Sequence, residues 1–562
     1  METLMKKLDR NRPLPNLPEK FVTANPTEDD LLLAVDGKAK ATIVFAKATV
    51  AAEAAIDLAD HLRKITGANF NLMADKGAMP EGNLILVGAT RTTLSLGEGI
   101  FESYPEGEGY TIRREGNILM LVGNDDGEFK GTQHAVTRFL EEAGCRWLTP
   151  EALWQNVQEA DSLAVRQVNR HVKPRFGARK LSAMPAEVRD RWYTGGRNTM
   201  VGHLLPSIVP AREYAEHPEF FAELDGSRDP SRFEYWHYCY TNKELAKRVA
   251  AAAIAYFDLH PNGTNYTVAA NDGWNDGWCD CEVCRKGNHA DQLLTLANNV
   301  GRIVKEVYPE KHLTILCYHS TFIPPAYVKA DDNVEVMFCL ESSPFEDFSA
   351  GSTTHLGVNP ITRFHYDKPW KETVGEYIKN TGLKTRTIWG WYCLSADFAG
   401  WKTIPWVQGN TITRNLQQFE DMGMSEIFFD SFGEPLDLRW PLFYPCCKGM
   451  YDGETDAETL LYDTCCLLYG AAADDMFLYY RSLADAALEH PGRLISVTWV
   501  PDEPGQIYSE DFEQIDATMK RALSKLEHLT PDQQKRVKNQ AAYWATVGQN
   551  MDMVSPFAEM LK

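Results

Sequence analysis

The sequence predicts an α/β protein centred on a (β/α)8 TIM-type barrel, with an N-terminal α/β accessory domain and a helical C-terminal region. Three observations lead to this fold class. The chain has 562 residues, which at ~150 residues per domain corresponds to roughly two to four domains. Short apolar segments alternate with helical patterns between residues 175 and 434, as in a barrel of about 250 residues. The last part of the chain shows the one-sided apolar spacing of helices.

The predicted accessory domain covers residues 20–150. Runs of apolar and β-branched residues indicate its strands, and one-sided apolar spacing indicates its helices. In chain order we expect a strand at 41–45, a helix at 51–65, a strand at 83–87, a hairpin of 110–112 with 117–122, and a helix at 131–143. Residues 151–172 are interpreted as a connector.

The predicted catalytic barrel covers residues 173–445, and the number of its segments carries the prediction. Helical patterns lie between several of them, for example at 243–257, 290–307 and 411–422. We expect eight parallel strands in one closed sheet, at 175–180, 199–204, 233–240, 266–271, 313–319, 334–340, 387–393 and 426–431.

The predicted helical region covers residues 446–562. Ile515, Met519, Leu523 and Leu526 recur at the spacing of one helix face. Residues 530–533 read Thr-Pro-Asp-Gln, which is typical of a capping box with proline at the first helical position.

The composition excludes several classes of partner. The 57 basic and 78 acidic residues give a net charge of −21, which argues against nucleic acid, because phosphate contacts need an excess of Lys and Arg. No apolar run approaches the ~18–20 residues of a membrane span. No secretory signal is visible, and the adjacent pairs Cys446–Cys447 and Cys465–Cys466 suit a disulfide framework poorly. We therefore expect a cytoplasmic protein, although an exported protein whose signal had been removed would read the same way.

The candidate catalytic residues are Asp272 and Glu341, which follow the fourth and sixth predicted strands. Barrel enzymes carry their catalytic groups at these strand ends. Glycoside cleavage needs one carboxylic acid to protonate the leaving oxygen and a second group to stabilise or attack the anomeric carbon. Asp272 is expected to be the acid, because Trp274 and Trp278 would give it apolar surroundings that favour the protonated form. The structural alternatives are an Asn-Asp-Gly turn for Asp272 and a surface cap or ion pair for Glu341.

Other polar and aromatic side chains at the predicted strand ends are candidates for substrate binding. Histidines can hydrogen-bond sugar hydroxyls and tryptophans can stack on sugar rings, although ordinary packing explains the tryptophans equally well. The candidates are His203, His237, Trp274, Asp276, Tyr318, His319, Trp389, Trp391 and Asp430. Together with Asp272 and Glu341, His203, His237, Trp274 and Trp389 or Trp391 are expected to line one pocket. Asp276, Asp430 and Glu434 are the reserve candidates for the acid.

The most compact motif is Cys279, Cys281 and Cys284. Three thiols within six residues can bind structural Zn²⁺ if His289 or a distant cysteine adds a fourth ligand. The alternative is three reduced thiols in a tight loop. No cofactor is expected for the reaction itself.

Two groups of segments carry a family resemblance. Residues 54–67, 84–88 and 131–147 resemble the accessory domain of α-glucuronidases. Residues 217–228, 271–284 and 468–472 resemble a bacterial barrel family of formerly unknown function, some members of which belong to glycoside hydrolase family 163. These members are endo-β-N-acetylglucosaminidases that release complex N-glycans, so the resemblance implies glycan cleavage.

The sequence thus predicts a glycoside hydrolase, with an endo-β-N-acetylglucosaminidase-like retaining enzyme as the leading hypothesis. On an N-acetylhexosaminide, the acetamido oxygen of the substrate would attack, and the enzyme would supply an acid and a carboxylate that orients the amide. The alternatives are an exo-acting, α-glucuronidase-like enzyme, for which Arg175, Arg179 and Arg363 are the candidate cationic clamp, and a non-catalytic glycan-binding protein on a barrel scaffold. An oligosaccharide or glycan is the expected partner.

Overall fold

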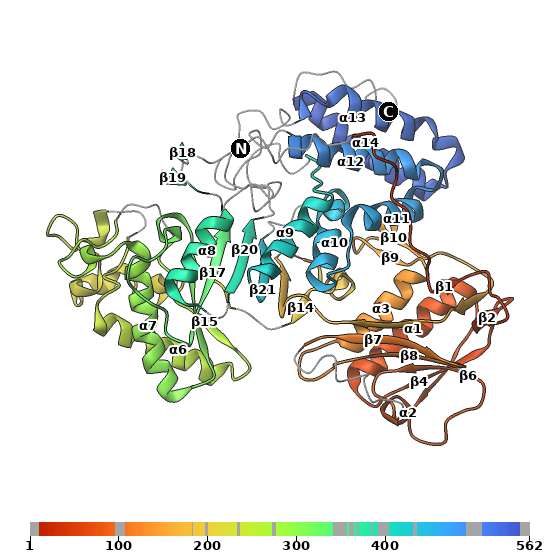
Figure 1. The fold of residues 1–562 in the computed structure, drawn as a ribbon, viewed down its shortest axis with the longest axis horizontal. Coiled ribbons are helices and arrows are strands. Elements are labelled where there is room, and N and C mark those ends of the chain that lie inside the picture. The colour runs from red at the N-terminus through yellow and green to blue at the C-terminus, as the bar shows by residue number, and fades with distance from the viewer. Residues whose placement is uncertain are drawn as a thin grey trace.

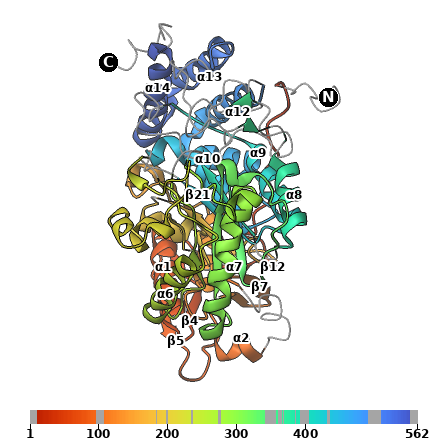
Figure 2. The same ribbon diagram turned by 90° about the vertical axis from the view of Figure 1, so that its left-hand side faces the viewer.

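The computed structural model describes residues 10–95, 107–182, 184–196, 200–232, 236–272, 277–340, 357–358, 365–366, 368, 370–383, 386–391, 404–430, 435–489 and 508–550. They form an N-terminal part with two main sheets, a central parallel sheet with helices, and a helical C-terminal part (Figure 1). Viewed from the side, the C-terminal helices and the N-terminal sheets lie at opposite ends of the molecule (Figure 2). None of the helices in these ranges is long and apolar enough to cross a membrane.

The N-terminal part contains the strands and helices that the sequence predicts. Its six-stranded sheet is packed on one face by α1 (Thr49–Thr66) and α3 (Gly131–Glu142). The hairpin turns at Gly116, whose φ of 55° is the left-handed conformation that glycine adopts without strain. The sheet order is β12 (Asn169–Val172), β7 (Tyr110–Glu115), β8 (Ile118–Gly123), β6 (Asn83–Val87), β4 (Ala41–Phe45) and β5 (Asn71–Ala74).

The expected connector at 151–172 is not a linker. It contributes β12 to the six-stranded sheet, where β12 pairs antiparallel with β7, and β11 to a second sheet, where β11 pairs antiparallel with β2. The second sheet has the order β1 (Val22–Thr23), β11 (Leu163–Val165), β2 (Leu31–Val35) and β3 (Lys38–Ala39), and β9 (Arg146–Trp147) pairs with β10 (Gln155–Asn156).

The central sheet contains six of the eight predicted barrel strands, all parallel. Its first and last strands along the chain, β13 (Ala178–Leu181) and β21 (Glu426–Asp430), are hydrogen-bonded neighbours. From there the order continues with β20 (Arg386–Trp391), β17 (Val334–Leu340), β16 (His312–Cys317) and β15 (Asn265–Thr267), and the short β14 (Gly195–Gly196) pairs antiparallel with β13. This arrangement is a half-barrel.

The predicted strands at 199–204 and 233–240 are wrong for the described residues, so the closed eight-stranded barrel is not confirmed. In place of a ladder, the side chains of Asn265 and Thr267 bond the backbone of Met200 at 2.8–3.2 Å. Tyr238 forms an antiparallel bridge with Phe221. Met200 is therefore held at the edge of β15 by side chains of that strand, and Tyr238 pairs with Phe221 instead of joining the parallel sheet.

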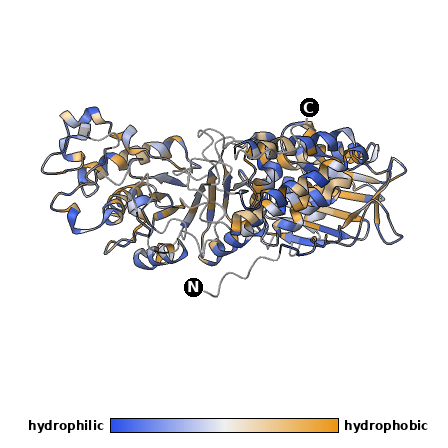
Figure 3. Cartoon of the chain, turned by 90° about the horizontal axis from the view of Figure 1, so that it is seen from above, coloured by the Kyte–Doolittle hydropathy of each residue, from blue (hydrophilic) through white to orange (hydrophobic). Residues whose placement is uncertain are grey.

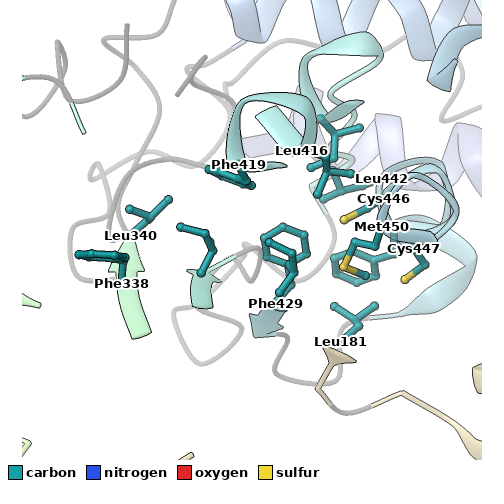
Figure 4. Packing of buried hydrophobic residues seen from close by; sticks show 14 of the residues in the cluster. Leu181, Phe338, Leu340, Leu416, Phe419, Phe429, Leu442, Cys446, Cys447 and Met450 are labelled. Carbon is teal, nitrogen blue, oxygen red and sulfur yellow. The ribbon is translucent and has the colours of Figure 1, made fainter. Parts of the chain in front are cut away.

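Alternation along the parallel strands separates two apolar clusters. Ile315, Phe338 and Phe429 pack into the main core with the helices, whereas Leu316, Met337 and Trp389 form a small cluster on the other face. The helices are α6 (Lys243–Leu259), α7 (His289–Val307), α8 (Trp370–Thr381) and α9 (Asn410–Asp421). Figure 4 shows part of the main core, where Leu181 and Phe429 lie close to the sulfur-bearing side chains of the helix that follows β21 in the chain.

That following helix, α10 (Leu436–Tyr451), is buried at every residue from Leu438 to Tyr451. A helix that is apolar on all sides belongs in the interior, and α10 contacts β13, α9 and the C-terminal helices. It runs on through residue 445, at which the second domain was expected to end. The helices near the C-terminus contain both hydrophobic and hydrophilic residues (Figure 3). The C-terminal helices are α11 (Ala457–Tyr469), α12 (Ala473–Glu489), α13 (Phe512–Ser524) and α14 (Pro531–Asn550).

The helical features predicted for the C-terminal part are present. Ile515, Met519 and Leu523 are buried on α13. The capping box also forms, since the Gln533 side chain accepts the Thr530 N–H at 3.0 Å and the Thr530 hydroxyl accepts the Gln533 N–H at 3.4 Å.

Buried charges join the N-terminal part to the centre. Glu108 accepts a hydrogen bond from Arg179 of β13. Glu141 of α3 accepts bonds from Lys448 of α10 at 2.6 Å and from the hydroxyls of Tyr444 and Tyr193 at 2.8 and 3.0 Å. Burial alone would raise the pKa of Glu108, but His134 and Arg179 outweigh it and lower the pKa from 4.5 to about 2.

This shift predicts an acid-sensitive junction. A carboxyl whose folded-state pKa is depressed stabilises the fold above its unfolded-state pKa, and that stabilisation is lost as the pH falls towards the folded-state value. For Glu108 the loss should occur between about pH 4.5 and about pH 2. The melting temperature of Glu108→Gln should therefore fall less steeply with pH in this range than that of the wild type. The exposed control Glu19→Gln should follow the wild type, and parallel curves for all three proteins would contradict the assignment.

Candidate active site

Three of the predicted site residues meet at the C-terminal end of the parallel sheet. The Tyr318 hydroxyl donates a hydrogen bond to Asp272 Oδ1 at 3.0 Å. His203 Nε2 lies 3.7 Å from the same oxygen, and the His203 and Tyr318 rings meet edge to face at 5.6 Å. The Asp272 side chain is 69% exposed, so its carboxylate is open to a ligand from solvent.

The backbone explains how these side chains converge. Asp272 follows β15, and Tyr318 follows the neighbouring strand β16, so their positions match at one end of the sheet. His203 lies beside β15 because its Nδ1–H donates to the Ala270 carbonyl at 2.7 Å. Since a carbonyl only accepts hydrogen bonds, the proton is on Nδ1, and Nε2 faces Asp272 as an acceptor in the neutral ring. His319, the next residue after Tyr318, has a φ of 49°, and such strain is typical of functional turns.

The apolar wall expected around Asp272 is not found among its described neighbours. Trp278 does not flank Asp272, because its indole is buried between two histidine rings. Its ring centroid lies 4.5 Å from that of His237 and 4.4 Å from that of His289. Burial lowers the pKa of His289 from 6.5 to about 4, so this ring is neutral at pH 7.

His237 therefore belongs to this aromatic stack. Its ring is 2% exposed, and Nδ1 is paired with the Tyr240 hydroxyl at 2.9 Å. Asn271 links the stack to the Asp272 group, because its side chain donates to the Trp236 carbonyl at 2.8 Å. The stack is thus connected to the residue that precedes Asp272 through Trp236, the neighbour of His237 in the chain.

Four cysteine thiols converge next to the stack. The Sγ atoms of Cys239, Cys279, Cys281 and Cys284 all lie within 4.8 Å of one another, and all four residues are buried. Cys239 is the fourth thiol, whereas His289 Nδ1 is bonded to the Ser320 hydroxyl at 2.7 Å. The described cysteines are free thiols.

The remaining candidates are spread over the sheet or lie outside the described residues. Trp389 is 8% exposed and packs edge to face on Phe428 in the small cluster of the second sheet face. Asp430 ends β21 and accepts a hydrogen bond from Ser182, and Trp391 is its partner in register. The candidates outside the described residues are Glu341, Trp274, Asp276 and Glu434.

Two contributors were missed by the sequence reasoning. Cys239 lies in a segment that was expected to be a strand, and its only signal in the sequence was that three thiols leave one position of a tetrahedral site for a histidine or a distant cysteine. Ser182 follows β13 and carries no motif. Both depend on pairing between distant parts of the chain, 42 residues for Cys239 with Cys281 and 248 for Ser182 with Asp430.

The fold and site define an α/β protein with a parallel half-barrel and an exposed carboxylate at the carboxyl ends of its strands. A family model described as "Domain of unknown function (DUF4838)" matches residues 152–481, and the chain belongs to this family. None of the curated proteins matches the chain. Among solved structures, that of CpGH84D aligns with a TM-score of 0.45 at 9% identity, covering 96% of this chain and 89% of that one. A similarity at this level supports no argument about activity.

Proposed function

We propose that this protein is a glycoside hydrolase that cleaves a glycan, with Asp272 as the general acid. The observation that carries the proposal is the exposed Asp272 carboxylate at the end of β15, held through Oδ1 by Tyr318 and faced by His203. Carboxylates at this end of a parallel sheet are where barrel enzymes do their chemistry. The resemblance of residues 271–284 to the barrel family that includes glycoside hydrolase family 163 points to the same reaction.

The contacts of Asp272 suit proton transfer. Within the described part of the chain, its hydrogen bond and its histidine contact both fall on Oδ1. Oδ2 can then carry the proton towards a glycosidic oxygen. Once that proton has left, the Tyr318 hydroxyl stabilises the negative carboxylate, because hydrogen bonds to charged groups are stronger than neutral ones.

The proposed reaction retains anomeric configuration, and an N-acetylglucosaminide is the proposed substrate. Its acetamido oxygen would attack the anomeric carbon while Asp272 protonates the leaving oxygen. Water would then open the intermediate, returning a proton to Asp272. Glu341 is proposed as the carboxylate that orients the amide. It comes directly after β17 in the sequence, and barrel enzymes carry their catalytic groups after the strands. Such substrate assistance is an exception to the two-carboxylate scheme.

Two arginines of the competing uronidase hypothesis are already engaged elsewhere. Arg175 pairs with Glu420 at 2.9 Å. Arg179 is 1% exposed and pairs with Glu108. Arg363, the third candidate for the cationic clamp, lies outside the described residues. Because a uronic acid needs such a clamp, the engagement of Arg175 and Arg179 supports the acetamido sugar over the uronic acid.

The decisive test is a screen of the purified full chain against aryl glycosides and intact N-glycoproteins. We expect release of an oligosaccharide from an N-glycoprotein, and turnover of aryl N-acetylglucosaminides in preference to aryl glucuronides. Turnover of glucuronides alone would favour the exo-acting alternative. Binding of glycans without any released product would instead identify a glycan-binding protein.

A milder prediction concerns the positioning residue Tyr318. We expect Tyr318→Phe to lower kcat on a substrate with a poor leaving group by about 10-fold, because a hydrogen bond to a charged group is worth ~1.5–3 kcal/mol. KM should change little, and the loss should shrink on an activated aryl glycoside. Tyr327→Phe is the matched control, since Tyr327 is 59% exposed. An equal loss on both substrates would show that Tyr318 merely supports the fold.

A further inference from the structure

We propose that Cys239, Cys279, Cys281 and Cys284 bind one structural Zn²⁺ ion, which fastens the segment at 236–240 to the loop that carries Asp272. This inference does not rest on the glycosidase proposal. It uses the geometry of the four thiols, the donors around them and the segments that they join.

The spacing of the sulfurs is that of a tetrahedral thiolate site. Zn–S bonds of about 2.3 Å in tetrahedral geometry place neighbouring sulfurs about 3.8 Å apart. Cys239 Sγ lies 3.9 Å from the Sγ atoms of both Cys281 and Cys284, and the largest separation within the group is under 4.8 Å. A disulfide needs about 2.05 Å between its sulfurs. The arrangement thus fits an ion at the centre of the group better than a disulfide.

The surroundings stabilise negative sulfur. The Glu223 backbone N–H points at Cys279 Sγ at 3.3 Å, and the Thr241 hydroxyl lies 3.1 Å from Cys284 Sγ. The Arg228 guanidinium also interacts with Cys239. Four thiolates around Zn²⁺ carry a net charge of −2, so N–H and O–H donors and a nearby cation are the second layer that such a centre needs.

The four thiols close the site. Sulfur-only tetrahedral sites hold zinc or iron, and a zinc ion with four protein ligands has no open position for a substrate or water. The role is therefore structural. Zinc is the ion proposed because its d¹⁰ shell tolerates the geometry that the chain imposes.

The ligands come from two segments that no strand ladder joins within the described residues. Cys239 belongs to the segment at 233–240 that was expected to be a barrel strand, and the other three belong to the loop after β15. Gln292 of α7 adds a third point of attachment, because its side chain donates to the Cys279 and Cys284 carbonyls at 3.1 and 3.3 Å. Trp278, next to Cys279, stacks on His237, and the residue before His237 accepts a hydrogen bond from Asn271. The proposed ion would connect these segments, as backbone hydrogen bonds connect neighbouring strands elsewhere in the sheet.

The test is elemental analysis of the purified full chain, with no activity measurement involved. We expect about one zinc ion per chain for the wild type and for Cys145→Ser, which changes a buried thiol of the N-terminal part. Cys239→Ser should lose most of its zinc, and limited proteolysis should then cut within 200–240 faster than in either reference. Should Cys239→Ser fail to fold, mercurial titration of the wild-type thiols decides, because it should release one zinc ion as the four cysteines react.

Three outcomes would overturn the proposal. One iron ion per chain and no zinc would show that the four thiols bind iron and not the proposed zinc. A metal-free wild-type protein whose melting temperature is unchanged by added zinc would show that the four cysteines are thiols that bind no ion. Zinc that stays bound to folded Cys239→Ser would place the ion elsewhere in the chain.

Discussion

Replacement of Asp272 by Asn should slow hydrolysis of a natural glycan by about 10²-fold or more, the usual scale of general acid catalysis. The amide keeps the shape of the side chain and can still accept the Tyr318 hydrogen bond, but it cannot deliver a proton to the leaving oxygen. An aryl glycoside with a good leaving group needs little protonation, so its glycosylation step should lose much less. Steady-state and single-turnover kinetics on the two substrates measure this difference.

Asp126→Asn supplies the matched control, because Asp126 is an exposed aspartate of the N-terminal part. It should leave both rates unchanged. Small and equal losses for Asp272→Asn on both substrates, in a folded protein, would remove Asp272 from the role. The acid would then have to be sought at Asp276, Asp430 or Glu434.

Replacement of Lys448 by Met should lower the free energy of unfolding by about 3–5 kcal/mol, the cost of leaving a buried charge without its partner. Lys448 Nζ lies 2.6 Å from Glu141 Oε2, and the two side chains are 5% and 4% exposed. Methionine fills much of the same space, so the expected loss is electrostatic rather than a cavity. Chemical denaturation of both proteins measures the difference.

The chain offers a control with the same contact at the surface. Lys305 Nζ also lies 2.6 Å from a carboxylate, that of Asp332, but these side chains are 42% and 59% exposed. Lys305→Met should cost at most about 1 kcal/mol, since exposed pairs contribute little. In the double variant Glu141→Gln/Lys448→Met, much of the lost stability should return, because no charge is then left unpaired. A double variant as unstable as Lys448→Met would point to packing around Lys448 as the cause.

Much of the fold could be predicted from the sequence, because its signals are local. The helix at 131–143 and the capping box at Thr530 follow from spacing within a few residues, and both are present. The strands at 199–204 and 233–240 could not be judged in this way. An apolar run beside a sheet has the same local pattern whether it pairs through its backbone or is held by side chains such as those of Asn265 and Thr267.

The candidate site divides in the same way. Asp272 and Tyr318 were predicted from their positions at strand ends, and parallel pairing brings these positions together. His203 was predicted at the end of a strand that does not form, and its hydrogen bond to the Ala270 carbonyl places it instead. The place of Trp278 was not predictable, because its sequence neighbours do not show that His237 and His289 stack on it. The sequence also could not show that Cys239, and not His289, is the fourth member of the thiol group. That contact joins segments that lie far apart in the chain.

The pairing of β13 with β21 has a consequence for the order in which the chain folds during synthesis. Ala178 is the register partner of Glu426, so the first strand of the sheet waits for almost 250 further residues before its parallel neighbour exists, although the short β14 can pair with its other edge much earlier. By contrast, β15, β16, β17 and β20 each pair with the strand of this sheet that follows along the chain, and the N-terminal sheets are complete once β12 has been made. Long-range pairings of this kind form slowly and leave edges exposed. A nascent chain that ends before residue 426 should therefore hold a finished N-terminal part beside a β13 whose edge towards β21 is still unpaired, and it is at this stage that a chaperone would be most needed.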